Sequence, residues 1–185
     1  EMGLRRLLGV EVHHVTLLEA VEEARAMDPR RVAEEADAMR RAAGRCDATA
    51  EEIERMAALT LAMRSITERY HLTGLAVKCW PEFAAHYGIM PCATIGRLND
   101  LGLPTSCEGD TLGAVTMLVG RELGGATPMF CDFIAIEEDR NVGLGWHCGA
   151  APACLAEKNA PIVLGKHPTA DGGRRGVNAS FPVRA

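Results

Sequence analysis

The chain has 185 residues, of which 48% are hydrophobic and 24% charged, a composition typical of one globular domain or of one domain and part of another. A formal net charge of −5 and an aromatic content of only 4% argue against a nucleic-acid-binding surface, which needs clustered positive charge and stacking rings. The sequence contains neither a continuous apolar run of about 18 residues nor the apolar core and cleavage site of a signal peptide. We therefore expect no membrane-spanning segment and a cytoplasmic location.

Seven cysteines are scattered along the chain, an odd number with no CxxC pair among them. This pattern disfavours both a disulfide framework and a zinc ribbon. We expect most of these cysteines to be reduced and packed as small hydrophobic residues.

The first third of the chain has the pattern of structural elements. The apolar segment from Leu7 to Val15 suits a strand, and three helices follow it, the last one ending near Tyr70. Each helix is expected because a start signal precedes its apolar stripe. The three signals are Thr16 with Glu19, Asp28 with Pro29, and Thr49 with Glu52.

Strands and helices alternate in the middle of the chain. A strand over residues 75–77 and a second one over 103–107 are each followed by a predicted helix, and this alternation predicts an α/β fold with a Rossmann-like, mostly parallel sheet flanked by helices. Glu82 follows the first strand, and Glu108 and Asp110 follow the second. Ligands bind at this edge of open α/β sheets, because strand ends and helix N-termini converge there. The helices are expected from Pro81, over 93–101 and over 111–123.

The pattern becomes β-rich after Gly124-Gly125, so we predict an α/β domain over residues 1–124 and a β-rich segment over 125–185. Strands are expected over 129–136, 141–146 and 162–164, with a short helix over 152–157. The tail from Thr169 to Ala185 is rich in Gly, Arg and small residues and is expected to be a loop.

Each candidate site residue also has a purely structural explanation. The helix dipole favours a carboxylate such as Glu82 in a first turn, and Asp110 is placed to be an N-cap. His147 suits a core histidine bonded to a backbone carbonyl. A thiol nucleophile near these carboxylates is the least favoured chemistry, because no pairing of a cysteine with a histidine is evident in the sequence.

Several short sequence motifs nevertheless form a recognisable set, and the resemblance they carry extends over about residues 5 to 170. They are KCWPEF at 78–83, the segment from Cys92 to Leu98 followed by NDLG, CEGD at 107–110, FCD at 130–132 and WHCG at 146–149. In these motifs the chain resembles the L-fucose isomerase and L-arabinose isomerase family of sugar isomerases, most closely its fucose-isomerase-like branch.

The resemblance implies an aldose–ketose isomerase that holds a divalent cation, Mn²⁺ or another such as Mg²⁺, between a glutamate, an aspartate and a histidine. By their positions in these motifs, Glu82 and Asp110 resemble the first two ligands, and both are expected to serve as acid/base groups as well. Glu108 is the rival second ligand. The family's histidine ligand lies far downstream, and no residue of this chain matches it.

The resemblance also implies an extent and an assembly. Family members have three domains, and this chain resembles the second domain and the start of the third, so we expect a fragment of a homo-oligomeric enzyme. Lys78, Trp80 and His147 are expected to contact the metal ligands or the sugar. The alternative is a catalytically silent binding or assembly module with the same fold.

Removing the proton beside a carbonyl and returning it to the neighbouring carbon is the chemistry that an aldose–ketose isomerase performs. A cation with oxygen ligands stabilises the negative charge that develops, and one carboxylate takes the proton while another acid returns it. Mn²⁺ and Mg²⁺ prefer such oxygen ligands.

Overall fold

A computed structural model describes residues 2–166 and 177–183 of the chain. Its helices are α1 (Met2–Leu8), α2 (Leu17–Arg25), α3 (Pro29–Ala42), α4 (Ala50–Arg69), α5 (Glu82–His86), α6 (Cys92–Asp100) and α7 (Thr111–Gly124), with short 3-10 turns at Glu138–Arg140 and Ala153–Leu155. Its strands are β1 (Arg45–Cys46), β2 (Leu75–Ala76), β3 (Thr105–Ser106), β4 (Asp132–Glu137), β5 (Val142–Trp146), β6 (Val163–Lys166) and β7 (Val177–Ser180). The α/β class is confirmed.

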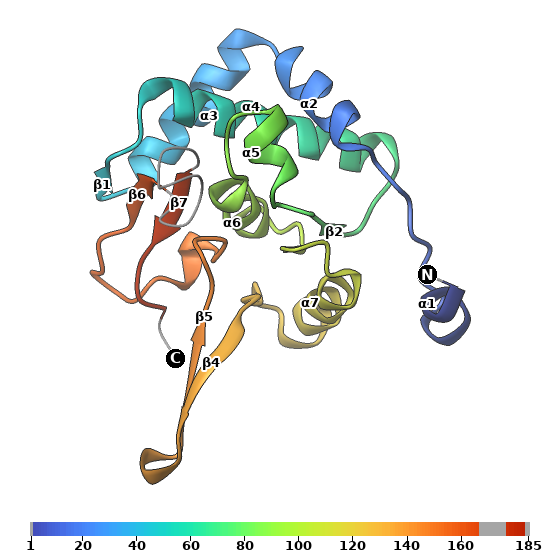
Figure 1. Cartoon of the computed structure of the whole chain (residues 1–185), viewed down its shortest axis with the longest axis vertical. Coiled ribbons are helices and arrows are strands. Elements are labelled where there is room, and N and C mark those ends of the chain that lie inside the picture. Colours follow the sequence, from blue (N-terminus) through green and yellow to red (C-terminus); the bar gives the residue numbers. More distant parts are fainter. Residues whose placement is uncertain (1, 167–176, 184–185) are drawn as a thin grey trace.

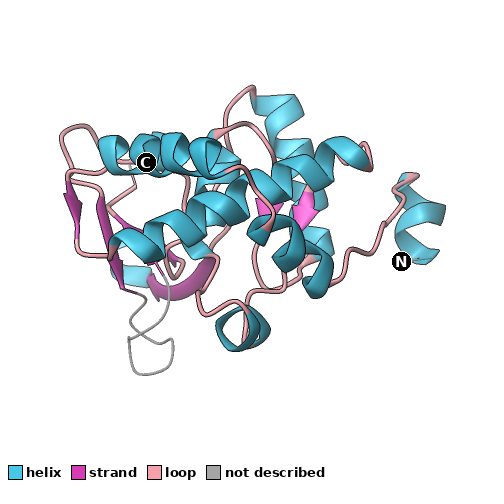
Figure 2. Cartoon of the chain, turned by 90° about the horizontal axis from the view of Figure 1, so that it is seen from above, coloured by secondary structure: helices cyan, strands magenta, loops and turns pink. Residues whose placement is uncertain are grey.

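Helix α4 is the centre of the molecule, and α2, α3 and α6 all pack against it (Figures 1 and 2). Its side chains Ile53, Met56 and Leu59 are completely buried in the hydrophobic core. Every residue from Met56 to Met63 is buried, as expected for the middle of a helix with neighbours on several sides. In the described ranges, no helix combines the length and the apolar character needed to cross a bilayer.

The strands form three small sheets. β2 and β3 pair in parallel, β4 and β5 form an antiparallel hairpin, and β6 lies between β1, to which it is parallel, and the antiparallel β7. Helix α7 packs against β2 and β3, and α6 contacts β3 and β7. The parallel pair is thus enclosed by helices, whereas the hairpin projects from the body of the molecule (Figure 1). The predicted domain boundary near residue 125 stays a prediction.

Two segments differ from what the sequence patterns predict. The expected strand from Leu7 to Val15 is wrong, because the chain is helical up to Leu8 and has no regular structure over 9–16. Gly9 has φ +68° and donates its N–H to the Arg5 carbonyl, so it ends helix α1 in the manner of a C-terminal glycine cap. Residues 177–180 of the expected loop form β7, while the part of that loop over 169–176 lies outside the described residues.

The three predicted helix starts are confirmed, although the expected capping box at Thr16 is only half formed, because the Glu19 carboxylate accepts from the Tyr70 hydroxyl instead. Thr49 accepts the Glu52 N–H at 3.2 Å, and the Glu52 carboxylate accepts the Thr49 N–H at 2.8 Å, which is a complete capping box at the start of α4. Thr16 and Asp28 likewise accept first-turn N–H groups of α2 and α3. These contacts fix where the two outer helices begin against α4.

Replacing Thr49 by Ala is expected to lower the free energy of unfolding by about 1 kcal/mol, because the Glu52 N–H at the start of α4 loses the hydroxyl that accepts it. Urea denaturation measures this change. Thr49→Ser keeps the hydroxyl acceptor and is expected to restore most of the loss. If both variants lost the same stability, the side-chain methyl group rather than the cap would be responsible.

Candidate metal centre

The turn after β3 carries the first residue of the candidate site. Glu108 and Gly109 both have left-handed backbone conformations, with φ of +61° and +73°. The Gly109 N–H donates to the Val77 carbonyl at 3.0 Å, which ties this turn to the end of the neighbouring strand β2. A left-handed conformation at a glutamate is uncommon and persists only where surrounding contacts hold it. The turn therefore presents the Glu108 side chain at the carboxyl ends of the parallel pair.

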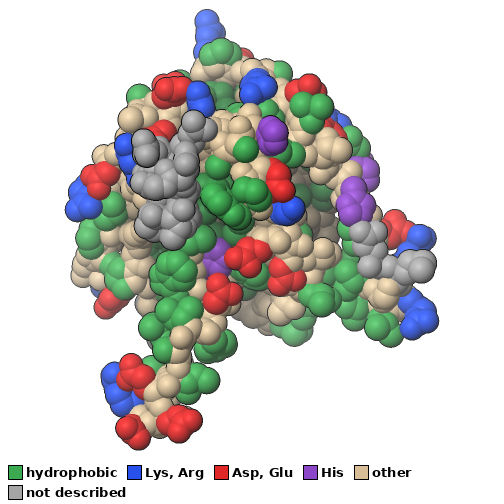
Figure 3. Space-filling model, in the orientation of Figure 1, with side chains coloured by type: hydrophobic (Ala, Val, Ile, Leu, Met, Phe, Trp, Pro, Cys, Tyr) green, Lys and Arg blue, Asp and Glu red, His purple; other side chains and the backbone are tan. Residues whose placement is uncertain are grey.

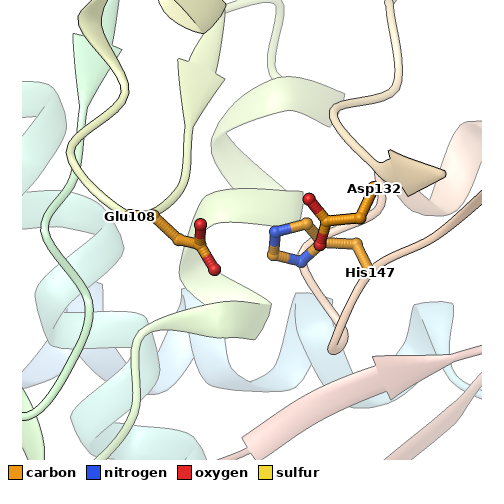
Figure 4. Close-up of side chains that lie close together, drawn as sticks. All are labelled: Glu108, Asp132 and His147. Atoms are coloured by element: carbon orange, nitrogen blue, oxygen red, sulfur yellow. The ribbon is translucent and has the colours of Figure 1, made fainter. Parts of the chain in front are cut away.

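The base of the hairpin carries the other two residues. Asp132 is the first residue of β4, and it pairs with Trp146, the last residue of β5. His147 follows directly, so the hairpin register brings Asp132 and His147 together although they lie far apart in the sequence. In Figure 4 both side chains reach toward Glu108 from the opposite side of a common space.

Glu108, Asp132 and His147 form one cluster, in which a ligand atom of each residue lies within 4.8 Å of the others. The two carboxylates are exposed to solvent, whereas His147 is 7% exposed. Acidic side chains gather beside a histidine on this face, above the projecting hairpin (Figure 3). The cluster therefore combines an accessible negative charge with a fixed imidazole.

The imidazole of His147 is held from several sides. Its ring lies 5.5 Å from the Phe130 ring, and its Nδ1 lies 3.7 Å from the Cys148 Sγ. Burial lowers the pKa of His147, but the contact with Cys148 and the negative charges of Asp132 and Glu108 outweigh it, so the net shift is upward. Both carboxylates thus act on the ring in the same direction, toward its protonated form.

The other ring nitrogen, Nε2, is buried and has no hydrogen-bond partner among the described residues. A buried polar atom without a partner costs free energy, so such an atom in a folded protein calls for an explanation. A cation coordinated by Nε2 and the two carboxylates would satisfy it. Two carboxylates and one imidazole are ligands that divalent cations accept, and three protein ligands leave coordination positions open for a substrate. The residues present therefore fit a divalent metal ion.

Glu82, a predicted ligand, lies at the start of α5 and forms an ion pair with Lys78 at 2.9 Å. This hydrogen bond with Lys78 is the main cause of a lowered pKa at Glu82, so the carboxylate is held in its ionised form. Its second oxygen, Oε2, is buried and unpartnered in the described part of the chain. Glu82 is not a member of the three-residue cluster.

Asp110, the other predicted ligand, is the N-cap of α7, and its Oδ1 accepts the Gly113 N–H at 2.9 Å. It also lies outside the cluster. The assignment of Glu82 and Asp110 as metal ligands stays a prediction, while the geometry brings together the rival Glu108 with His147 and Asp132.

Among the residues predicted to contact the ligands or the sugar, His147 lies in the cluster itself, Lys78 is engaged by Glu82, and Trp80 is half exposed. Asp132 is the residue that the sequence reasoning missed. The motif FCD contains Asp132, but nothing in the neighbouring sequence indicates that a single aspartate before an apolar strand binds a metal. Only the hairpin register reveals its position.

Two buried thiols lie beneath the turn that carries Glu108. The Cys107 thiol donates a hydrogen bond to the Cys79 sulfur at 3.3 Å. This bond lowers the pKa of Cys79 to about 7 against the opposing effect of burial, whereas the same contact and burial raise the pKa of Cys107. None of the seven cysteines, all of which lie in the described residues, forms a disulfide, and Cys46 and Cys154 are exposed rather than packed in the core.

Glu108, Asp132 and His147 form a candidate divalent-cation site on an α/β chain. Comparison with known proteins shows which enzymes have a similar sequence. Sulfoquinovose isomerases of Priestia aryabhattai and Priestia megaterium are each 31% identical over 169 residues, which are 91% of this chain and 38% of each relative. The sulfoquinovose isomerase of Alkalicoccus urumqiensis is 31% identical over an alignment of 186 positions that covers 98% of this chain and 41% of that relative.

The chain is therefore similar to curated sugar isomerases along nearly its whole length, and it spans about two fifths of the length of the relatives it matches. No protein-family model matches it. The narrower resemblance to the fucose and arabinose isomerases stays a prediction.

Proposed function

We propose that this chain contributes the cation site of a metal-dependent aldose–ketose isomerase. The observation that supports this most directly is the cluster of Glu108, Asp132 and His147, whose ligand atoms lie within 4.8 Å of one another. The similarity to sulfoquinovose isomerases supports a sugar as substrate. We take sulfoquinovose as the first candidate substrate, and L-fucose and L-arabinose as the candidate substrates that the sequence motifs imply.

The donor set accommodates Mn²⁺ or another divalent cation such as Mg²⁺. When bound, such a cation supplies an electrophile for the negative charge that develops on the sugar oxygens during proton transfer. Glu108 and Asp132 would hold it from two separate segments of the chain, and His147 would fix its position, because burial limits the movement of the ring. The exposed carboxylates leave the side facing solvent open to the sugar.

Glu82 is our candidate for the proton-transferring base. A base must be unprotonated at the working pH, and the ion pair with Lys78 lowers the pKa of Glu82, which keeps it ionised. Asp110 is the candidate partner acid, since the Gly113 N–H engages only its Oδ1. Glu82 follows β2, and Asp110, like Glu108, follows β3, which pairs with β2 in parallel; this supports a place for both carboxylates near the cation site.

A homo-oligomer is the assembly that the family resemblance implies. The hairpin leaves large apolar side chains in solvent, with Phe133 79% exposed and Ile136 73% exposed. Exposed apolar surface of this kind is common where subunits or domains meet. We propose that an interface of the full assembly covers it.

Ketose formation tests the proposed function. The protein encoded by the whole open reading frame around these residues should be assayed with Mn²⁺ against sulfoquinovose, L-fucose and L-arabinose. We expect turnover of at least one sugar, loss of turnover in EDTA, and recovery when Mn²⁺ is returned. Absence of turnover on all three sugars, with metal bound, would favour the catalytically silent module instead.

A further inference from the structure

The thiols of Cys79 and Cys107 face each other where β2 and β3 end. Their sulfur atoms are 3.3 Å apart, although the residues are 28 positions apart in sequence. Both are free thiols, and Cys79 is 5% exposed while Cys107 is completely buried. Burial alone would place each sulfur against carbon, so direct contact between two sulfurs from separate strands needs a further reason.

The geometry is close to that of a disulfide. A sulfur–sulfur bond is about 2.05 Å long, so the two sulfurs must approach by a little more than 1 Å for it to form. The strands that precede them are already paired in parallel, with Leu75 opposite Thr105 and Ala76 opposite Ser106. The backbone hydrogen bond from Gly109 to Val77 keeps the two ends together beyond the last paired residues. Little chain movement is needed.

We propose that Cys79 and Cys107 form a redox-active dithiol, a modification site that a small peroxide oxidises to a disulfide. The Cys79 thiolate attacks one peroxide oxygen, the O–O bond breaks, and hydroxide leaves and is protonated to water. The Cys107 sulfur then attacks the sulfenic sulfur of Cys79, the S–O bond breaks, and the Cys107 proton leaves with the oxygen as water. Two thiols lose two electrons, and one peroxide becomes two waters.

Cys79 is the sulfur that is oxidised first, because it retains some solvent contact whereas Cys107 has none. Hydrogen peroxide is small enough to use so narrow an opening. Cys107 is then in place as the resolving thiol.

Oxidation has a consequence for the cation site, and this consequence rests on the proposed function. Glu108 directly follows Cys107, and its turn is held in left-handed conformations by the contacts around it. Drawing Cys107 toward Cys79 therefore displaces the base of the Glu108 side chain relative to Asp132 and His147. We expect the disulfide form to bind Mn²⁺ about 10-fold more weakly than the dithiol form, the lower end of what misplaced ligand contacts cost.

The test uses the 185-residue chain with the exposed Cys46 and Cys154 replaced by Ser, which removes the thiols most prone to link separate molecules. After treatment with hydrogen peroxide, mass spectrometry should show a monomer about 2 Da lighter, because each thiol loses one hydrogen. Proteolysis without reduction should yield a linked peptide pair containing Cys79 and Cys107. Dithiothreitol should reverse both signals.

Matched variants separate this pair from the other thiols. The Cys107→Ser variant should leave Cys79 as a sulfenic acid, which mass spectrometry detects as one added oxygen, whereas the Cys92→Ser variant should form the disulfide at an unchanged rate. A linked pair of Cys92 with Cys148, or peroxide treatment that yields only sulfinic acids, would overturn the proposal. Because peptide mapping of the parent protein needs no buried substitution, poor folding of a variant does not decide the result.

Two readouts keep the two proposals apart. Mn²⁺ titration of the reduced protein tests the cation site, and peptide mapping tests the dithiol. Equal Mn²⁺ affinity in fully reduced and fully oxidised protein would overturn the link between the dithiol and Glu108.

Discussion

Replacing Glu108 by Gln, or Asp132 by Asn, is expected to weaken Mn²⁺ binding by about 100-fold or more. Each substitution keeps the shape of the side chain but removes the negative charge from one member of the cluster. Loss of an outer contact to a metal ligand already costs about 10- to 100-fold in affinity, so loss of a ligand should cost at least as much. Isothermal titration calorimetry, or the decrease of the free Mn²⁺ signal in electron paramagnetic resonance, measures the change.

The chain supplies two controls with the same chemistry. Glu82→Gln and Asp110→Asn remove a carboxylate near the same strand ends but outside the cluster. They are expected to weaken binding by less than about threefold, because only a screened attraction is lost. Asn is also a good N-cap, so Asp110→Asn should leave the start of α7 intact.

The comparison decides between two ligand sets. If Glu82→Gln and Asp110→Asn abolished Mn²⁺ binding while Glu108→Gln and Asp132→Asn did not, the ligands would be Glu82 and Asp110, as the sequence motifs imply. A circular dichroism spectrum of each variant establishes that the helices remain formed.

The sequence predicts the half of the site that depends on local chain geometry. Glu108 and Asp110 follow a short strand and precede a helix, and both lie at the strand ends as expected. The structural explanation of Asp110 as an N-cap is confirmed by its bond from the Gly113 N–H. These features can be predicted from the sequence, because helix caps and strand ends depend on neighbouring residues.

The other half of the site depends on the register of the hairpin, which the sequence does not reveal. The pairing of β4 with β5 has an irregularity between Phe133 and Ala135, and such a shift decides which residues lie opposite one another. Asp132 and His147 meet only because of this pairing. The fold shows the same division, since the capped helices were predictable whereas the strand β7 and the helix α1 were not.

Replacing Gly149 by Ala is expected to lower the free energy of unfolding by about 2 to 5 kcal/mol. Gly149 has φ +98°, a conformation that side chains with a Cβ rarely adopt. An added Cβ would also lie 2.2 Å from the Asn178 Cβ and 2.9 Å from its Cα. The backbone of β7 would have to move, because the clash involves atoms that no side-chain rotation can displace.

The loss should extend to the cation site, because Gly149 donates its N–H to the His147 carbonyl at 2.9 Å. Urea denaturation gives the free energy, and Mn²⁺ titration below the transition reports on the site. Gly124→Ala is the matched control, since an added Cβ there meets nothing within 4 Å and Ala is the better helix former at the end of α7. Equal stability of the Gly149→Ala and Gly124→Ala variants would mean that the loop after His147 can move away from β7 at no cost, and the buried imidazole would then not be fixed in place.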